Sequence, residues 1–118
     1  LTTTTTSRVW VLADGESRDG TVDPRALGLA PATREDLVGG DPAHNAGVVR
    51  DLVGGATGPV RDIVLLNAAA ALLAYSGPDP SRPITEQLGE HLAVADAAIT
   101  SGAAARLLDE WAALTATV

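Results

Sequence analysis

The segment from Gly58 to Leu72 is apolar on almost every side of a helix, and it carries a single amide, Asn67, near its centre. A helix that is hydrophobic all round is normally buried all round. A buried amide costs free energy unless its donors and its acceptor are paired. We therefore predict that this segment is the central helix of a packed domain and that Asn67 is buried and hydrogen-bonded.

The chain begins at Leu1 and contains no methionine. Its first seven residues, Leu1–Ser7, are mostly threonine and lack the basic start and apolar core of a secretory leader. We therefore expect the sequence to be a piece of a longer chain.

Composition limits the classes of protein and of site. The 118 residues suit one modest domain. The absence of Cys excludes disulfides, thiol catalysis and thiolate metal sites, and it is compatible with the cytoplasm, where we expect the protein. The net charge of −7 argues against non-specific binding to nucleic acid and against docking on anionic membranes. No apolar run approaches the roughly 20 residues that a membrane-spanning helix needs.

The first part of the chain has the pattern of a β-hairpin followed by a connector. Thr2–Leu12 is rich in β-branched residues and predicts a strand. Ala13–Gly20 is turn material, after which Thr21-Val22 begins a short return strand. Asp23-Pro24 resembles the capped start of a helical turn that stops at Gly28. A further turn is expected near Glu35–Leu37.

The rest of the chain is predicted to be helical. The α+β class follows from this order, an N-terminal β-hairpin and then about four helices. We expect one domain, 1–118, with the hairpin and connector in 1–30 and the helices in 41–118. The helices are expected from Asp41-Pro42 to Val53, from Pro59 to Tyr75, from Ile84 to Thr100 with Leu88, Leu92, Ala95 and Ile99 on one face, and after Ser101-Gly102 with Leu107, Leu108, Trp111 and Leu114.

Two glycine-rich loops at helix starts are candidates for phosphate binding. Gly39-Gly40-Asp41-Pro42 and Gly54–Gly58 both precede a predicted helix, where bare amides can cradle a phosphate. Glycines also supply positive φ at helix ends. Asp41 would repel a phosphate at its own helix start, and neither loop fits a nucleotide-binding pattern. The structural role is therefore favoured for both.

Histidines and acidic pairs are the other candidates for chemistry. His44 and His91 lie on different helices, and neither has a second ligand at metal-binding spacing. Asp109 and Glu110 are adjacent, so on a helix they do not converge on one ion. We expect ordinary solvated or hydrogen-bonded roles for all four residues.

Four polar residues are expected to have structural roles: Asp41, Asn45, Asp62 and Asn67. Asp62 falls in the first turn of the central helix, where a carboxylate gains from the helix dipole. We expect Asp62 and Asn67 to anchor that helix through hydrogen bonds. The residues alone predict a globular module without catalytic, substrate-binding or metal-binding residues.

Three segments together resemble the carboxy-terminal third of the anthranilate phosphoribosyltransferase family of tryptophan biosynthesis. The resemblance covers essentially the whole chain, and the Asn-Ala-Ala motif is its most specific part. Asp23-Pro24, Leu27-Gly28-Leu29 and Ser101–Ala104 fit the connecting segments. The three segments are the threonine run Leu1–Ser7, then Gly39-Gly40-Asp41-x-x-x-Asn45-Ala46, then Gly58-Pro59-x-x-Asp62-x-Val64-x-Leu66-Asn67-Ala68-Ala69.

The resemblance implies a magnesium-dependent transfer of phosphoribose from phosphoribosyl pyrophosphate to the amine of anthranilate. It also implies a homodimer built from a helical domain and a larger α/β domain of phosphoribosyltransferase type. The family's pyrophosphate-binding Gly-Thr-Gly-Gly-Asp loop and its anthranilate-binding residues lie upstream of the matched region. Its magnesium-binding Asp-Glu pair would come immediately before Leu1, so Asp109-Glu110 does not represent it. This chain is therefore expected to bind no Mg²⁺ and to be inactive alone.

Two other interpretations remain open. A non-catalytic interaction module could retain the tail of this fold and bind a partner through exposed apolar surface. Such a module should be monodisperse with polar edges, whereas a fragment should self-associate or bind the missing upstream portion. A related nucleoside phosphorylase shares the architecture, but Asn67-Ala68-Ala69 and the threonine run favour the anthranilate enzyme.

Overall fold

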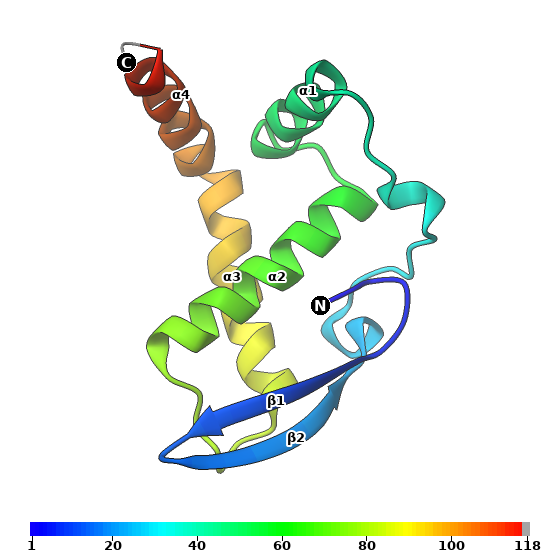
Figure 1. Ribbon diagram of the computed structural model, residues 1–118, viewed down its shortest axis with the longest axis vertical. Coiled ribbons are helices and arrows are strands. Elements are labelled where there is room, and N and C mark those ends of the chain that lie inside the picture. Colours follow the sequence, from blue (N-terminus) through cyan, green and yellow to red (C-terminus); the bar gives the residue numbers. More distant parts are fainter. Residues whose placement is uncertain (117–118) are drawn as a thin grey trace.

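Strands occupy the start of the chain and helices most of the remainder in the computed structural model, which describes residues 1–116 (Figure 1). The predicted α+β order, a hairpin followed by four helices, is confirmed for these residues. Residues 117 and 118, the end of the predicted helical region, lie outside the described part. The elements are β1 (Ser7–Ala13), β2 (Glu16–Val22), the 3-10 helices η1 (Pro24–Leu27) and η2 (Glu35–Leu37), and the helices α1 (Pro42–Val53), α2 (Pro59–Ser76), α3 (Ile84–Thr100) and α4 (Ala103–Thr115).

β1 and β2 form an antiparallel hairpin closed by a two-residue turn at Asp14 and Gly15. Both residues have positive φ, 52° and 78°. These values suit the type I′ turn that matches the twist of a hairpin and that Asp-Gly favours. The expected long turn over Ala13–Gly20 is wrong, because β2 pairs with β1 from Glu16 onward. The polar side chains of β2 are tolerated in a strand because most of them are exposed.

The prediction that the strand begins at Thr2 is wrong, because β1 begins only at Ser7 and the threonine run lies outside it. Threonine hydroxyls compete for backbone groups and so favour turns over ladders. Here the Thr2 hydroxyl accepts a hydrogen bond from the backbone N–H of Thr4 at 3.1 Å. The Thr3 carbonyl accepts from the N–H of Ala32 at 3.1 Å, which ties the run to the connector after η1.

α2 crosses α3 near the centre of the molecule, and the hairpin lies below both helices in Figure 1. Leu66 and Ala69 of α2 are fully buried. The expectation that α2 is buried on every side is nevertheless wrong, because Val64 is 41% and Tyr75 93% exposed. An all-apolar pattern predicts that other residues pack against every face of the helix. The described residues pack against only one side of α2.

The core consists of two apolar clusters along α2 and α3. In the first, Val22 of β2 packs with Leu73 of α2 and Leu88 of α3. In the second, Leu65 of α2 packs with Ala95 and Ile99 of α3. The predicted apolar face of α3 is therefore confirmed, with Leu92 half-buried between the two clusters.

α4 contributes little to this core, and none of its described residues is buried. Leu107 and Trp111, one turn apart, are 67% and 64% exposed. Beside it, a hollow of about 570 Å³ lies between the four α-helices and is lined only by apolar residues, among them Leu52, Val94 and Ala104. The molecule therefore presents apolar surface that its own described residues leave uncovered.

Among the described residues, α2 is long and apolar enough to cross a membrane, judged by length and composition alone. This differs from the expectation that no apolar run approaches a membrane span. The core helix of a globular protein passes the same test. α2 also packs its buried face on α3 and carries the buried, ion-paired Arg61, and both features fit a core helix.

Candidate functional site

Asn67 uses its amide to hold both backbone groups of Leu1. Its Oδ1 accepts a hydrogen bond from the amino group of Leu1 at 2.7 Å, and its Nδ2 donates to the Leu1 carbonyl at 3.0 Å. The same Nδ2 donates to the Ile63 carbonyl, one turn earlier in α2, at 2.9 Å. The hydrogen bonds expected of Asn67 are thus present, but the expected burial is wrong, because the residue is exposed at the side of α2.

Asn45 makes the same kind of two-point contact at the start of α1. Its Oδ1 accepts from the N–H of Gly40 at 2.9 Å, and its Nδ2 donates to the Gly40 carbonyl at 2.9 Å. Asp41 caps the helix, with its Oδ1 accepting from the N–H of His44 at 2.8 Å. These contacts agree with structural roles for Asp41 and Asn45. The carboxylate of Asp41 occupies the place where a phosphate would have to bind.

Gly39 and Gly40 are needed for close approach, not for positive φ as the sequence suggested. Neither is among the glycines with positive φ. A Cβ on Gly40 would lie 2.8 Å from Cδ2 of His44, and one on Gly39 would lie 3.0 Å from Oδ1 of Asn45. In the second loop, Gly55 and Gly58 have φ of 100° and 121°, so the predicted conformational role applies to them.

Arg61 and Asp62 occupy the first turn of α2 beside Asp96 of α3. Arg61 is only 9% exposed, and its Nη2 lies 2.6 Å from Oδ1 of Asp96. Its Nη1 is buried without a hydrogen-bond partner among the described residues. The expected hydrogen bond of Asp62 is not present within residues 1–116, so the helix dipole is the interaction that remains for this carboxylate.

A hollow of about 430 Å³ opens beside this turn and is lined by Arg61, Asp62, Asp96 and Thr57 among others. Two carboxylates and one guanidinium that is already paired give it no surplus of positive charge. A phosphate gains from unpaired cations and free amides. The charge of this hollow therefore does not favour a phosphate.

The histidines are not brought together. His44 is exposed at the start of α1. His91 of α3 has Nδ1 2.9 Å from the Gln87 carbonyl and Nε2 2.9 Å from the hydroxyl of Ser76. Asp109 and Glu110 are exposed on α4, and the described residues contain no group of three or more acidic, His or Cys side chains placed to hold a metal ion.

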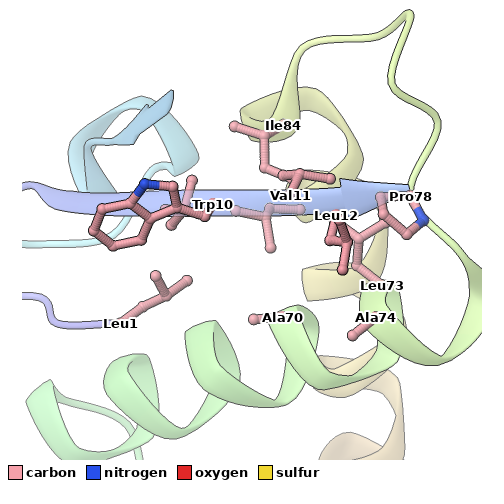
Figure 2. A pocket seen from close by; sticks show the side chains of 11 residues that line it. Leu1, Trp10, Val11, Leu12, Ala70, Leu73, Ala74, Pro78 and Ile84 are labelled. Carbon is pink, nitrogen blue, oxygen red and sulfur yellow. The ribbon is translucent and has the colours of Figure 1, made fainter. Parts of the chain in front are cut away.

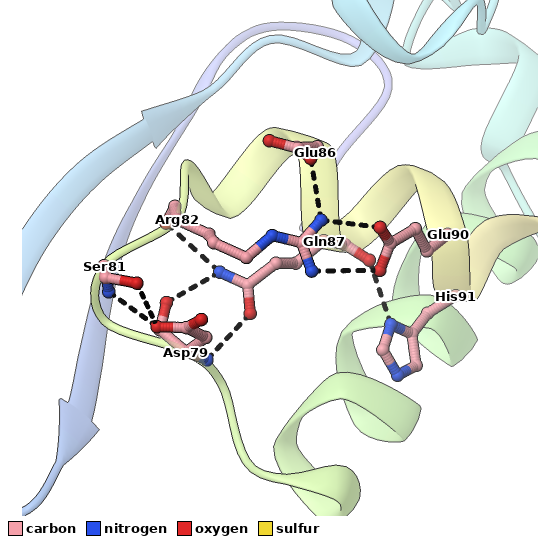
Figure 3. A network of polar contacts seen from close by, with 7 residues as sticks. All are labelled: Asp79, Ser81, Arg82, Glu86, Gln87, Glu90 and His91. Atoms are coloured by element: carbon pink, nitrogen blue, oxygen red, sulfur yellow. Dashed lines mark hydrogen bonds and ion pairs between the residues drawn. The ribbon is translucent and has the colours of Figure 1, made fainter.

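A buried glutamine, which the sequence analysis did not single out, organises the linker between α2 and α3 (Figure 3). Gln87 is 4% exposed. Its Oε1 accepts from the N–H of Asp79 at 2.8 Å, and its Nε2 donates to the carbonyls of Asp79 and Arg82 at 2.9 and 3.1 Å. The sequence feature that could have indicated the burial of Gln87 is its position next to Leu88, on the buried side of α3.

Acid should destabilise the fold through carboxylates in its turns. Hydrogen bonds from the backbone N–H and hydroxyl of Thr33 lower the pKa of Asp36, and those from the hydroxyl and N–H of Ser81 lower the pKa of Asp79. A carboxylate with a lowered pKa stabilises the fold above its unfolded pKa, and this contribution is lost as the pH falls through the lower folded value. The melting temperature should therefore decrease when the pH is lowered below about 4.

Thermal unfolding followed by circular dichroism at several pH values measures this effect. The double variant Asp36→Asn, Asp79→Asn should show a smaller drop in melting temperature between about pH 5 and pH 3. An equal drop in the variant and the parent chain would assign the acid sensitivity to other groups.

Replacing Asn67 with leucine should lower the free energy of unfolding by about 1 kcal/mol or slightly more, because three hydrogen bonds are lost. Urea unfolding measures the change. Asn67→Asp is a matched control, since it keeps the acceptor for the Leu1 amino group but loses the donor to the carbonyls. We expect it to retain part of the stability. No measurable loss in Asn67→Leu would show that the contact between Leu1 and α2 is unimportant.

Comparison with known proteins agrees with the sequence resemblance. The model of the glycosyl transferase family, a/b domain, matches residues 1–105. Anthranilate phosphoribosyltransferase of Leifsonia xyli subsp. xyli is 52% identical over 119 residues, which cover 98% of this chain and 34% of the relative. The enzymes of that name from an Arthrobacter and a Nocardioides species are 50% and 52% identical, again over 98% of this chain and 32% and 33% of theirs.

The chain therefore spans about a third of the length of these relatives. They bear the name that the motifs in Leu1–Ser7, 39–46 and 58–69 predicted, and the chain corresponds to their carboxy-terminal portion. The family match covers all of the described elements except α4, of which it includes only the first residues, 103–105. The chain thus belongs to the glycosyl transferase family, as part of its a/b domain.

Proposed function

We propose that this chain is the carboxy-terminal portion of an anthranilate phosphoribosyltransferase. The whole enzyme would transfer phosphoribose from phosphoribosyl pyrophosphate to the amine of anthranilate and release pyrophosphate. The observation that carries the proposal is the identity of about half the residues over nearly the whole chain with enzymes of that name.

Within that enzyme, the role that we propose for this portion is structural. Transfer from a pyrophosphate donor requires cations and oriented donors that offset charge on the departing group. The chain has a net charge of −7. The side-chain amides of Asn67 and Asn45 are hydrogen-bonded to backbone groups, and Arg61 is paired with Asp96. We propose that the contact of Asn67 holds the segment around Leu1 in place behind the reacting groups, which other residues of the enzyme supply.

Magnesium is part of the proposal only for the whole enzyme. The proposal that this chain supplies no magnesium site is supported by the described residues, in which no group of three or more acidic, His or Cys side chains is placed to hold a metal ion. Mg²⁺ prefers several oxygen ligands. We derive no step through magnesium from this chain. Its ligands would come from residues outside it.

The proposed partners follow from the same assignment. We propose that the chain binds the upstream portion of the same fold and that the whole enzyme is a homodimer without nucleic-acid or membrane partners. Because the proposed donor is a highly charged sugar phosphate that bilayers exclude, we place the reaction in the cytoplasm.

A reconstitution experiment tests this function. The chain is co-expressed with the remaining two-thirds of the Leifsonia xyli relative, and anthranilate consumption is followed with phosphoribosyl pyrophosphate and Mg²⁺. We expect consumption by the reconstituted pair and none by either part alone. Consumption by this chain alone would refute the structural role. An assembled pair without any consumption would refute the enzymatic assignment.

A non-catalytic interaction module remains the second candidate, favoured by the exposed Leu107 and Trp111 on α4 and the apolar hollow beside them. Sedimentation of the isolated chain separates the two. A stand-alone module should sediment as one monomeric species. A portion of a larger fold should self-associate through these surfaces.

A further inference from the structure

The two edges of the hairpin differ in what they leave unpaired. In a two-residue turn, the flanking residues Ala13 and Glu16 form a hydrogen-bonded pair, and such pairs alternate with non-hydrogen-bonded ones along an antiparallel ladder. Arg8, Trp10 and Leu12 therefore direct their backbone N–H and C=O groups away from β2. Within residues 1–116 the sheet ends at β1, so these groups meet no further strand.

The outer edge of β2 is protected. Arg18 donates a hydrogen bond to the Pro80 carbonyl at 2.7 Å, and this contact brings the linker between α2 and α3 alongside β2. A covering loop is one of the usual ways in which proteins block an edge strand. The ion pair between Arg8 and Asp19, at 2.8 Å, joins the two strands and so does not distinguish their edges.

Within the described residues, the edge of β1 has no hydrogen bond to a covering loop like that of Arg18. Trp10 and Leu12 are 67% and 74% exposed. A hollow of about 260 Å³ separates this edge from α2, with Leu1, Ala70 and Ala74 among its lining (Figure 2). The small side chains of Ala70 and Ala74 lie one turn apart on α2 and leave room for the side chains of another strand.

We propose that a β-strand from the remaining two-thirds of the enzyme pairs with β1 and fills this hollow. The identity of the partner strand rests on the proposed function. The strand would exchange backbone hydrogen bonds with Arg8, Trp10 and Leu12, and its alternate side chains would be apolar and face Ala70 and Ala74.

Three observations favour this occupant over a second copy of the chain. A domain of the a/b family needs a sheet with helices packed on it, and the described residues supply two strands only. The relatives are about three times as long as this chain. Leu1 lines the hollow and is held there by Asn67, so the first residue of the chain lies next to the open edge.

Hydrogen exchange of the backbone amides tests the pairing directly. In the isolated chain, the amides of Arg8, Trp10 and Leu12 should exchange rapidly. In the co-expressed pair they should slow by at least about tenfold, since they become ladder donors. The amides of Ser17 and Asp19, on the outer edge of β2, should change little. Unchanged exchange of the β1 amides in the assembled pair would overturn the inference.

A matched pair of proline variants tests the same edge by affinity. Trp10 and Asp19 lie opposite each other, and neither donates to the ladder between β1 and β2. Trp10→Pro removes an outward N–H of β1 and should weaken binding of the complementary portion by about tenfold or more. Asp19→Pro removes the equivalent N–H of β2 and should change binding by less than about twofold. Equal effects of the two variants would contradict the proposal.

The outcomes separate this inference from the proposed function. An assembled pair with protected β1 amides but no anthranilate consumption supports the pairing and refutes the enzymatic role. A pair that consumes anthranilate while its β1 amides exchange freely refutes the pairing alone. Protection of these amides that rises with the concentration of the isolated chain, and that does not change with the complementary portion, would identify a second copy as the occupant and overturn the proposal.

Discussion

Replacing Leu66 with alanine is expected to lower the free energy of unfolding by about 2–5 kcal/mol. Leu66 is fully buried at the centre of α2, and it is among the largest side chains with no exposed surface. Truncation removes apolar contacts and leaves a cavity that a close-packed interior fills only in part. Urea unfolding followed by circular dichroism measures the change.

The matched control is Leu107→Ala, the same truncation on the exposed side of α4. Leu107 is 67% exposed, so the expected change is within about 0.5 kcal/mol. Equal losses of unfolding free energy in Leu66→Ala and Leu107→Ala would contradict the assignment of Leu66 to the core and of Leu107 to the surface.

Removing the partner of Arg61 should have the second largest effect. Asp96→Ala leaves a guanidinium that is 9% exposed without its ion pair. Breaking a buried pair costs about 3–5 kcal/mol, and we expect about 2–3 kcal/mol here because Asp96 itself is 45% exposed and partly screened. Urea unfolding again gives the number.

The double variant Arg61→Met, Asp96→Ala serves as control. It removes the stranded charge and keeps most of the apolar volume, so it should recover much of the stability lost in Asp96→Ala. A double variant that is less stable than Asp96→Ala would show that the guanidinium stabilises the fold by contacts other than this pair.

The helices could be predicted from sequence because their ends carry local signals. Asp41-Pro42 and Gly58-Pro59 mark two helix starts, and Gly28 and Gly102 have the positive φ that favours glycine at breaks. β2 was harder to predict, because its polar residues resemble a loop. Only the Asp14-Gly15 turn indicates that a strand follows directly.

The contacts of the site were less predictable because they join distant parts of the chain. Asn67 could be expected to make hydrogen bonds, but its partner Leu1 is 66 positions away. The pairing of Arg61 with Asp96 depends likewise on how α2 packs against α3. The sequence pattern of α2 is apolar on almost every side, as predicted. This pattern does not show whether the residues that pack against each face belong to the same stretch of chain.

The central claim is that this portion builds the structure around a site whose binding groups lie elsewhere. Titrating the ¹⁵N-labelled isolated chain with phosphoribosyl pyrophosphate, anthranilate and Mg²⁺ tests it most directly, since a bound ligand shifts nearby amide resonances. We predict no saturable shifts with any of the three, separately or together. Saturable shifts that cluster around one set of residues would show that this chain carries a binding site of its own and would contradict the account.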